Sequence, residues 1–232
     1  MPTYDESYPG ILAALAESAS PPVSGGEARG PFAALVAALL ERSADPRKVD
    51  RALSALDDAG LLDPHALSEA DAAEVADVLK SSGLSLPART LGPLQRLARW
   101  LVERHRGSAE SLHFSGVATP RLREELAGLN GIGPATADAL LLFGLRRAAY
   151  PLDRATYRIF LRHGWLDPTT EYEDARDTVE RPAGDDPEAL VQLAEGLERV
   201  GREFCRARVA RCDRCPLRPF LPEGGAIEWE GD

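Results

Sequence analysis

Lysine is almost absent from this chain of 232 residues, although arginine is abundant. Only Lys48 and Lys80 are lysines, whereas 25 residues are arginines. A reaction that uses a lysine amine as its nucleophile therefore has at most two candidates. Cysteine is scarce as well, and its three copies all lie between residues 205 and 215. In a reducing compartment such a cluster favours metal ligands over a disulfide.

Membrane-spanning and sheet-forming patterns are also missing. No apolar run is long enough to cross a bilayer, and the first ten residues lack a basic segment before an apolar core, so we expect a cytoplasmic protein. Runs that alternate apolar and polar residues are nearly absent. The composition, 44% apolar and 28% charged, argues against wholesale disorder. The sequence therefore predicts an all-α fold.

Helical periodicity begins near Pro31. Apolar residues recur three or four positions apart, which predicts helices over residues 32–40, 49–56, 66–83, 91–107 and 188–205. Residues 1–31 contain a stretch rich in serine, proline and glycine without an apolar period. We therefore expect this N-terminal segment to be flexible.

Residues 126–137, LAGLNGIGPATA, are typical of two helices joined by a tight glycine turn. Gly131 and Gly133 can adopt positive φ and expose their backbone N–H groups, and Pro134 suits the first turn of the second helix. Such a turn suits a DNA phosphate without reading the base sequence. An ordinary corner between two helices, ended by a glycine cap, is the alternative.

Three motifs together resemble the endonuclease III branch of the helix-hairpin-helix DNA glycosylases. They are LNGIGPATA, then YPLDRATYRIF, then the spacing Cys-x6-Cys-x2-Cys, and the similarity extends from about Pro31 to Leu221. The resemblance implies two helical lobes around a DNA-binding cleft that receives a flipped base. The implied boundaries are a flexible segment packing on the second lobe at 1–31, a central lobe ending in the hairpin at 32–148, a second lobe at 149–221 and an acidic tail at 222–232.

Within this resemblance, Asp153 is the carboxylate that assists loss of the base. A carboxylate held there stabilises the cationic sugar of N-glycosidic cleavage or activates water against it. The alternative is that Asp153 only caps the helix that follows it, and both roles are compatible. Contacts to the DNA backbone are implied for the hairpin and for arginines of the second lobe, namely Leu129, Gly131, Ile132, Gly133, Ala135, Thr136, Arg158, Arg206 and Arg208.

Two positions depart from the family pattern. Family members that cut the strand carry a lysine one position before the Thr-Ala pair of the hairpin, and this chain has Ala135 there. An alanine forms no Schiff base, so we expect lyase activity to be weak or absent. Ser43 stands where the family carries a larger polar residue that fills the gap left by the flipped base. A capped turn between two helices is the alternative for Ser43, and Arg42 or another loop is the alternative gap filler.

The cysteines form a third departure. Cys205, Cys212 and Cys215 match the first three ligands of the family's [4Fe-4S] cluster, but Leu221 occupies the fourth position. A cluster would need another fourth ligand, such as Asp213, Glu223, water or a partner. The alternatives are zinc held by three thiolates and three thiols without metal.

The net charge of −10 is unevenly distributed. Residues 86–165 hold 12 arginines and 6 acidic residues, a net of +6, and residues 199–220 hold 7 arginines and 2 acidic residues, a net of +5. These two segments contain the hairpin, the aspartate and the cysteines, so a local positive face suits a DNA partner.

The leading hypothesis is a monofunctional DNA glycosylase of base-excision repair. It predicts a monomer that acts on double-stranded DNA with a damaged base or an abasic site, without a membrane partner, and associated with the nucleoid if the source is a bacterium. The rival hypotheses are a non-catalytic relative that binds damaged or abasic DNA, and a protein-interaction module without a role on DNA.

Overall fold

The computed structural model describes residues 3–18, 29–86, 88–113 and 116–228. The chain forms two helical units, one from residues 25–149 and one from residues 1–24 together with 150–232. Within the described ranges there are helices and one isolated bridge, between Cys205 and Ala210, but no strand. The predicted all-α fold is therefore confirmed. No helix among the described residues is long and apolar enough to cross a membrane.

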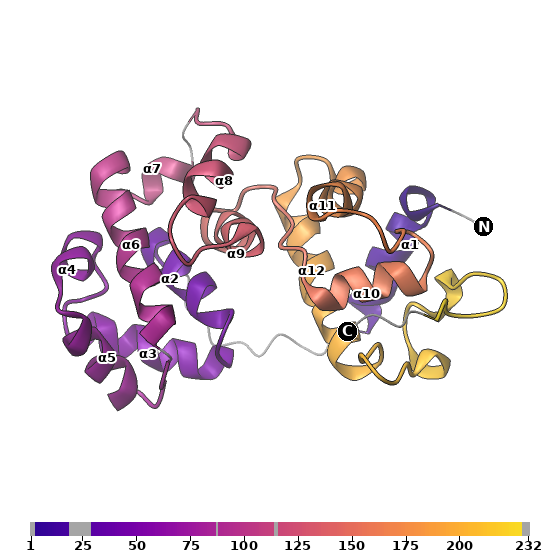
Figure 1. Cartoon of the computed structure of the whole chain (residues 1–232), viewed down its shortest axis with the longest axis horizontal. Helices are drawn as coiled ribbons and strands as arrows, with labels where there is room; N and C mark the ends of the chain where they lie inside the picture. Colours follow the sequence, from indigo (N-terminus) through magenta and orange to yellow (C-terminus); the bar gives the residue numbers. More distant parts are fainter. Residues whose placement is uncertain (1–2, 19–28, 87, 114–115, 229–232) are drawn as a thin grey trace. The chain divides into compact units, whose positions relative to one another are not determined.

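The 25–149 unit is built around α2 (Pro31–Glu41), which is apolar on almost every side. Leu35, Val36 and Leu40 are fully buried, as expected for a helix enclosed by others. Gly144 lies so close to α2 that a Cβ at this position would approach Leu35 Cδ2 to 2.7 Å. Helix α2 packs against α3 (Pro46–Asp58), α6 (Ala88–His105), α9 (Pro134–Ala139) and a π-helix, η1 (Leu140–Gly144). The unit also contains α4 (Pro64–Glu69), α5 (Ala72–Ser81), α7 (Glu110–His113) and α8 (Thr119–Ala127) (Figure 1).

The helix predicted over residues 66–83 is wrong in one respect, because the chain breaks between α4 and α5. Ala70 is extended, with ψ 148°, and Asp71 begins a new helix. The Asp71 carboxylate accepts a hydrogen bond from the backbone N–H of Ala73 at 2.7 Å. Asp71 therefore caps the start of α5, and a new helix begins here although the apolar periodicity continues through the break.

The second unit contains α1 (Tyr4–Glu17), α10 (Arg154–Arg162), α11 (Tyr172–Glu180) and α12 (Pro187–Glu203), together with three short 3₁₀ turns, η2 (Arg181–Ala183), η3 (Cys212–Arg214) and η4 (Arg218–Phe220). Both α1 and α10 pack on α12 (Figure 1). Gly196 of α12 admits Leu15 of α1, because a Cβ there would lie 2.8 Å from Leu15 Cδ1. This unit carries Asp153 at the start of α10 and the cysteines after α12.

The prediction that residues 1–31 are flexible is wrong for residues 4–17, which form α1. Thr3 and Glu6 make a capping box at its start. Tyr4, Ile11 and Leu15 recur at helical spacing and are buried in the core of the unit. Most of the serine-, proline- and glycine-rich stretch falls at residues 19–28, outside the described residues, so its composition says nothing about residues 4–17.

Candidate active site

The predicted hairpin is present, with α8 ending at Ala127 and α9 beginning at Pro134. Gly131 has φ +87°, a conformation that side chains rarely adopt. A Cβ at Gly131 would also lie 2.7 Å from Pro93 Cγ of α6. Arg96, one turn along α6, donates from Nε to the carbonyl oxygen of Asn130 at 2.7 Å. The turn is therefore braced against α6 and not held by its own sequence alone.

Gly133 differs from the prediction, because its φ is −83° and its backbone is extended. A Cβ at Gly133 would meet no atom within 4 Å. Packing within the protein therefore does not explain a glycine there. The carbonyl of Gly133 accepts hydrogen bonds from the N–H groups of Thr136 at 3.0 Å and Ala137 at 2.9 Å, which starts α9. The exposed side of the turn is left open to a close approach by another molecule.

The other hairpin residues divide into anchors and accessible positions. Ile132 is buried in the core and Leu129 is half-buried against it, so their side chains hold the turn in place. The N–H of Ile132 donates to the carbonyl of Leu129 at 2.9 Å. Ala135 and Thr136 are half-buried in the first turn of α9. Any contact of Leu129 or Ile132 with DNA would therefore use the backbone.

Asp153 is the N-cap of α10, in extended conformation with φ −106° and ψ 171°. Its Oδ1 accepts a hydrogen bond from the backbone N–H of Thr156 at 2.7 Å. Among the described residues, no group donates a hydrogen bond to Oδ2. The side chain is half-buried. One oxygen therefore holds the carboxylate in place while the other is available for chemistry, so the capping role and the catalytic role are compatible.

The predicted arginines occupy different environments. Arg158 is buried and donates from Nε to the carbonyl of Cys205 at 3.0 Å, which ties the loop 205–211 to α10. Arg206 and Arg208 are exposed on that loop, where side chains can reach a phosphate. Arg206 also donates to the carbonyl of Arg202 at 3.1 Å. The DNA contacts of all three arginines stay predictions.

Arg162 holds the same loop from the other end of α10. Its Nη1 donates to Cys205 Sγ at 3.2 Å and to the carbonyl of Arg206 at 2.8 Å, and its Nη2 donates to the carbonyl of Ala207 at 2.8 Å. The guanidinium is buried. One charged side chain therefore satisfies three acceptors of the loop and helps to order it.

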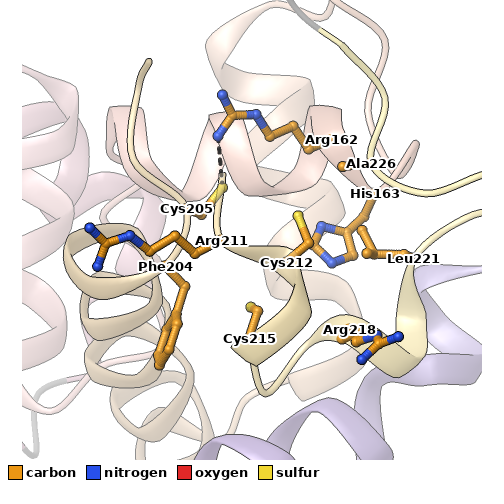
Figure 2. Close-up of a pocket in the computed structure, with 10 residues that line it drawn as sticks. All are labelled: Arg162, His163, Phe204, Cys205, Arg211, Cys212, Cys215, Arg218, Leu221 and Ala226. Atoms are coloured by element: carbon orange, nitrogen blue, oxygen red, sulfur yellow. Dashed lines mark hydrogen bonds between the residues drawn. The ribbon is translucent and has the colours of Figure 1, made fainter. Parts of the chain in front are cut away.

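Figure 2 shows the cavity that the three cysteines line, together with Arg162, His163 and Leu221. Burial raises the pKa of Cys215 to about 11 and also raises the pKa of Cys212. Both thiols are therefore protonated at neutral pH in the absence of a cation. A metal site would require them to lose their protons.

The donor set does not fit a cluster with four protein ligands. Leu221, which lines the same cavity, offers only an alkyl group at the fourth position. Within residues 3–18, 29–86, 88–113 and 116–228, no three His, Cys, Asp or Glu side chains converge as metal ligands. We therefore derive no step through an iron–sulfur cluster.

Ser43 and the two lysines lie in the 25–149 unit. Ser43 is exposed in the turn between α2 and α3, where its N–H donates to the carbonyl of Leu40 at 3.0 Å. Asp45, two residues later, caps α3. This is the capped turn that was the alternative at this position. Lys48 in the first turn of α3 and Lys80 in the last turn of α5 are both exposed.

Comparisons with known proteins agree with this geometry. No protein-family model matches the chain. A protein of Methanocaldococcus jannaschii, whose name assigns it provisionally to the DNA repair glycosylases, is 27% identical over 190 residues, covering 82% of this chain and 84% of the relative. Endonuclease III of Sulfolobus acidocaldarius is 26% identical over 197 residues, covering 84% of this chain and 83% of the relative.

A solved structure shares the fold of the chain. Endonuclease III trapped as a covalent intermediate with DNA has a TM-score of 0.69 at 22% identity, covering 97% of this chain and 98% of that one. The chain is therefore similar in sequence to an endonuclease III and to a protein named as a DNA repair glycosylase, and it shares the endonuclease III fold. The resemblance inferred from the three motifs is thus confirmed.

Two buried residues beside Asp153, Tyr150 and Thr156, are not among the site residues predicted from the sequence. Both are buried, and the Tyr150 hydroxyl lies 2.9 Å from Thr156 Oγ1. Tyr150 precedes α10 whereas Thr156 lies inside it, so no single periodic pattern places the two side chains together. No signal in the sequence therefore pointed to this pair.

Proposed function

We propose that this endonuclease III-like protein is a monofunctional DNA glycosylase that hydrolyses the N-glycosidic bond of a damaged base in duplex DNA. The observation that carries the proposal is the state of Asp153. Its carboxylate is held by one oxygen at a helix start, and its other oxygen accepts no hydrogen bond within the described part of the chain. The names of the relatives and the hairpin with its open outer side support DNA as the partner.

In the proposed reaction the bond between C1′ of the sugar and the base nitrogen breaks, and the electron pair leaves with the base. The sugar passes through a cationic state, which the charge of Asp153 stabilises. The oxygen of a water molecule then bonds to C1′, and its proton passes to Asp153 or to the departing base. The products are the free base and an abasic site in an uncut strand.

Ala135 is the reason to propose hydrolysis alone. The family's lyase step needs an amine that attacks C1′ as a nucleophile, and alanine has none. Lys48 and Lys80 lie on exposed helix ends, on α3 and α5, and neither belongs to the hairpin. The strand-cutting step therefore has no nucleophile at the position where the family supplies it.

A non-catalytic protein that binds damaged or abasic DNA is the second candidate. Ser43 favours it, because this short side chain lies exposed in a capped turn and is too small to fill the gap left by a flipped base. This candidate keeps the hairpin contacts and gives Asp153 only its capping role.

Base release from a panel of duplexes separates the two candidates. The panel carries an oxidised pyrimidine, an alkylated purine, uracil or a mismatch, and the protein is compared with Asp153→Asn. Asparagine is also a good N-cap, so the variant keeps the helix start and loses the charge. Catalysis predicts release from at least one duplex and its loss in Asp153→Asn. Tight binding to an abasic duplex without release from any member supports the second candidate.

A further inference from the structure

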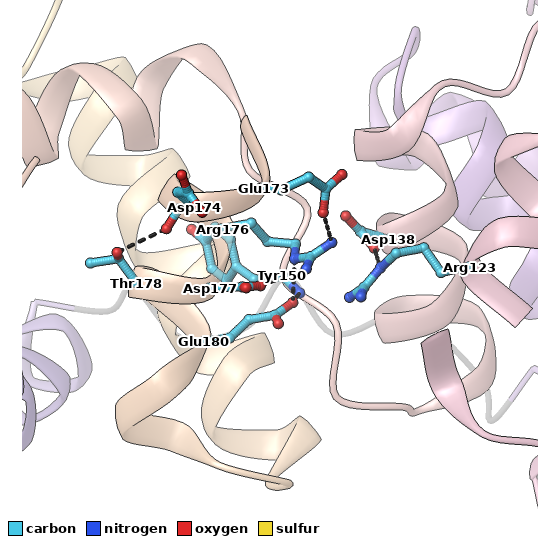
Figure 3. Close-up of polar contacts among 9 residues, drawn as sticks. All are labelled: Arg123, Asp138, Tyr150, Glu173, Asp174, Arg176, Asp177, Thr178 and Glu180. Atoms are coloured by element: carbon cyan, nitrogen blue, oxygen red, sulfur yellow. Dashed lines mark hydrogen bonds and ion pairs between the residues drawn. The ribbon is translucent and has the colours of Figure 1, made fainter. Parts of the chain in front are cut away.

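Tyr150 is buried in the core, and both its backbone N–H and its side-chain hydroxyl have polar partners. Its side chain is 1% exposed. Its backbone N–H donates to Glu180 Oε1 of α11 at 2.5 Å, and its hydroxyl lies 2.9 Å from Thr156 Oγ1 of α10. Figure 3 shows Tyr150 and Glu180 next to each other. A phenylalanine would fill the same core volume, so the hydroxyl has a role besides packing.

Thr156 connects this tyrosine to the candidate catalytic carboxylate. It is 2% exposed and occupies the third residue of α10. Its backbone N–H donates to Asp153 Oδ1 at 2.7 Å, while its Oγ1 meets the Tyr150 hydroxyl. The cap itself needs only the backbone N–H, so the side-chain contact adds a constraint that a helix start does not require.

The segment between Tyr150 and Asp153 closes into a small ring of interactions. The N–H of Leu152 donates to the carbonyl of Tyr150 at 2.9 Å, which makes a tight turn, and both Pro151 and Leu152 are buried. Asp153 is therefore held from its N-terminal side by the turn and from its C-terminal side by Thr156. The Tyr150–Thr156 contact joins these two sides directly.

The anchor at Glu180 extends into α11. Glu180 also lies 3.6 Å from Arg176 Nε, and Arg176 pairs with Glu173 and Asp177 on the same helix (Figure 3). These charges hold the half-buried Glu180 close to the backbone of Tyr150. The position of Asp153 thus depends on two helices, α10 and α11, through one tyrosine.

Burial, together with the charge of Asp153, raises the pKa of Tyr150, so the phenol stays neutral at physiological pH. A neutral phenol does not repel the carboxylate, and its dipole remains oriented in a water-free surrounding where dipoles act strongly. This arrangement suits a group that must keep its geometry while charge develops nearby.

We propose that Tyr150 and Thr156 are positioning residues for Asp153, which hold its carboxylate with Oδ2 directed to the reacting sugar. The inference rests on the proposed function of Asp153. Catalytic groups lose rate when they move by a fraction of an ångström, so removal of the hydroxyl contact affects the reaction more than binding.

The test compares Tyr150→Phe and Thr156→Val with Thr156→Ser, which keeps the oxygen. Tyr4→Phe is the matched control, because Tyr4 is a buried tyrosine of the same unit whose hydroxyl donates to the carbonyl of Val179 at 3.4 Å. Single-turnover base release is measured with enzyme in excess on the panel duplex that the parent protein cleaves, together with the Kd for an abasic duplex and the thermal unfolding curve.

We expect Tyr150→Phe and Thr156→Val to release base about tenfold more slowly at an unchanged Kd, and Thr156→Ser to restore most of the rate. We expect Tyr4→Phe to release base at the parent rate. Parent rates in folded Tyr150→Phe and Thr156→Val overturn the inference, and so does an equal loss in Tyr4→Phe.

Asp153→Asn, measured alongside, separates the two claims. If Asp153→Asn is slow while Tyr150→Phe keeps the parent rate, the positioning inference fails and the proposed function stands. If Asp153→Asn keeps the parent rate, or if the parent releases no base, the proposed function fails. The positioning inference then fails as well, because it rests on that function.

Discussion

The carboxylate of Asp138 and the guanidinium of Arg123 form an ion pair that joins the two helices of the hairpin (Figure 3). Asp138 lies on α9 and is completely buried, whereas Arg123 lies on α8 with 16% of its side chain exposed. A buried charge is costly unless it has a charged or hydrogen-bonded partner. This buried ion pair therefore holds the two helices of the hairpin together within the 25–149 unit.

Removal of one member of this pair is expected to be strongly destabilising. Arg123→Met removes a cationic partner of the buried Asp138 carboxylate and should lower the free energy of unfolding by about 3 kcal/mol in chemical denaturation. Arg121→Met is the matched control, because Arg121 is exposed and pairs with Glu125 at 3.3 Å on the helix surface. That variant should change the free energy by less than about 1 kcal/mol. Equal losses of unfolding free energy in the two variants would contradict this role of the ion pair.

The two hairpin glycines should respond differently to alanine. Gly131→Ala places a Cβ at positive φ and against Pro93, so we expect a loss of about 1–3 kcal/mol in the free energy of unfolding. Gly133→Ala has open space and ordinary φ, so its stability should stay at the parent value.

Affinity for duplex DNA gives the other half of this comparison. The Cβ of Gly133→Ala lies on the open side of the turn and should raise the Kd, measured at low salt because phosphate contacts are salt-sensitive. If Gly133→Ala binds DNA as well as the parent does, the turn does not contact the backbone.

His163 should make the stability of its unit depend on pH. It is buried, its Nδ1 lies 2.7 Å from the carbonyl of Ile159, and its ring stacks on Trp165. Burial lowers the pKa of His163 below its usual value of 6.5. The unfolded chain therefore binds a proton that the folded chain rejects, and stability falls as the pH drops below about 6.5.

Denaturation curves between pH 7 and pH 5 measure this dependence. His163→Gln should reduce the slope by up to about 1.4 kcal/mol per pH unit. His65→Gln, at an exposed histidine of α4, is the control for the substitution itself. The same slope in the parent and in His163→Gln would show that His163 is not the titrating group. His105, whose pKa burial also lowers, keeps its own contribution in every variant.

The cysteine loop should depend on Arg162 more than on its thiols. The protein purified without oxygen should lack iron and the visible absorption of an iron–sulfur chromophore, since only three cysteines line the cavity and Leu221 occupies the fourth position. Cys205→Ser/Cys212→Ser/Cys215→Ser should keep DNA affinity within about twofold of the parent.

Arg162→Met removes three hydrogen bonds to the loop and should weaken DNA binding and lower the unfolding temperature. Stoichiometric iron in the anaerobic protein, or loss of folding in the triple serine variant, contradicts this account of the loop.

The hairpin and the start of α10 were predictable because each depends on local sequence. Gly131 needs positive φ, and Asp153 stands before a helical run as a cap. The turn and the helix start were therefore each visible in a few neighbouring residues, although the brace from α6 and the negative φ of Gly133 were not. The three cysteines of the predicted ligand spacing line one cavity.

The contacts between distant segments were not predictable from the sequence. Arg96 braces Asn130 across 34 positions, and Glu180 holds Tyr150 across 30 positions, through contacts that no periodicity encodes. The expected flexible N-terminus failed for a related reason. The helix that contains Ile11 is stabilised by packing on α12. Because α12 lies far along the chain, the composition of residues 1–31 alone does not reveal this contact.

Ala135 gives a direct way to restore the missing nucleophile. Ala135→Lys supplies an amine at the hairpin position, and we expect borohydride to trap a covalent complex of this variant with abasic DNA. The parent protein should give no such complex. Thr136→Lys, one residue further along α9, is the positional control and should trap less. Efficient trapping of the parent would place an active amine elsewhere in the chain.

Base release and strand breakage, counted in the same reaction, show whether the protein hydrolyses the N-glycosidic bond without cutting the strand. A duplex that the protein cleaves is incubated with excess protein, and each sample is divided before treatment with alkali. Hydrolysis alone, assisted by Asp153, predicts one free base for every alkali-sensitive site and strand breaks only after alkali. Both signals should be lost in Asp153→Asn. Strand breaks that appear with base release before alkali, or release that Asp153→Asn leaves unchanged, would contradict this mechanism.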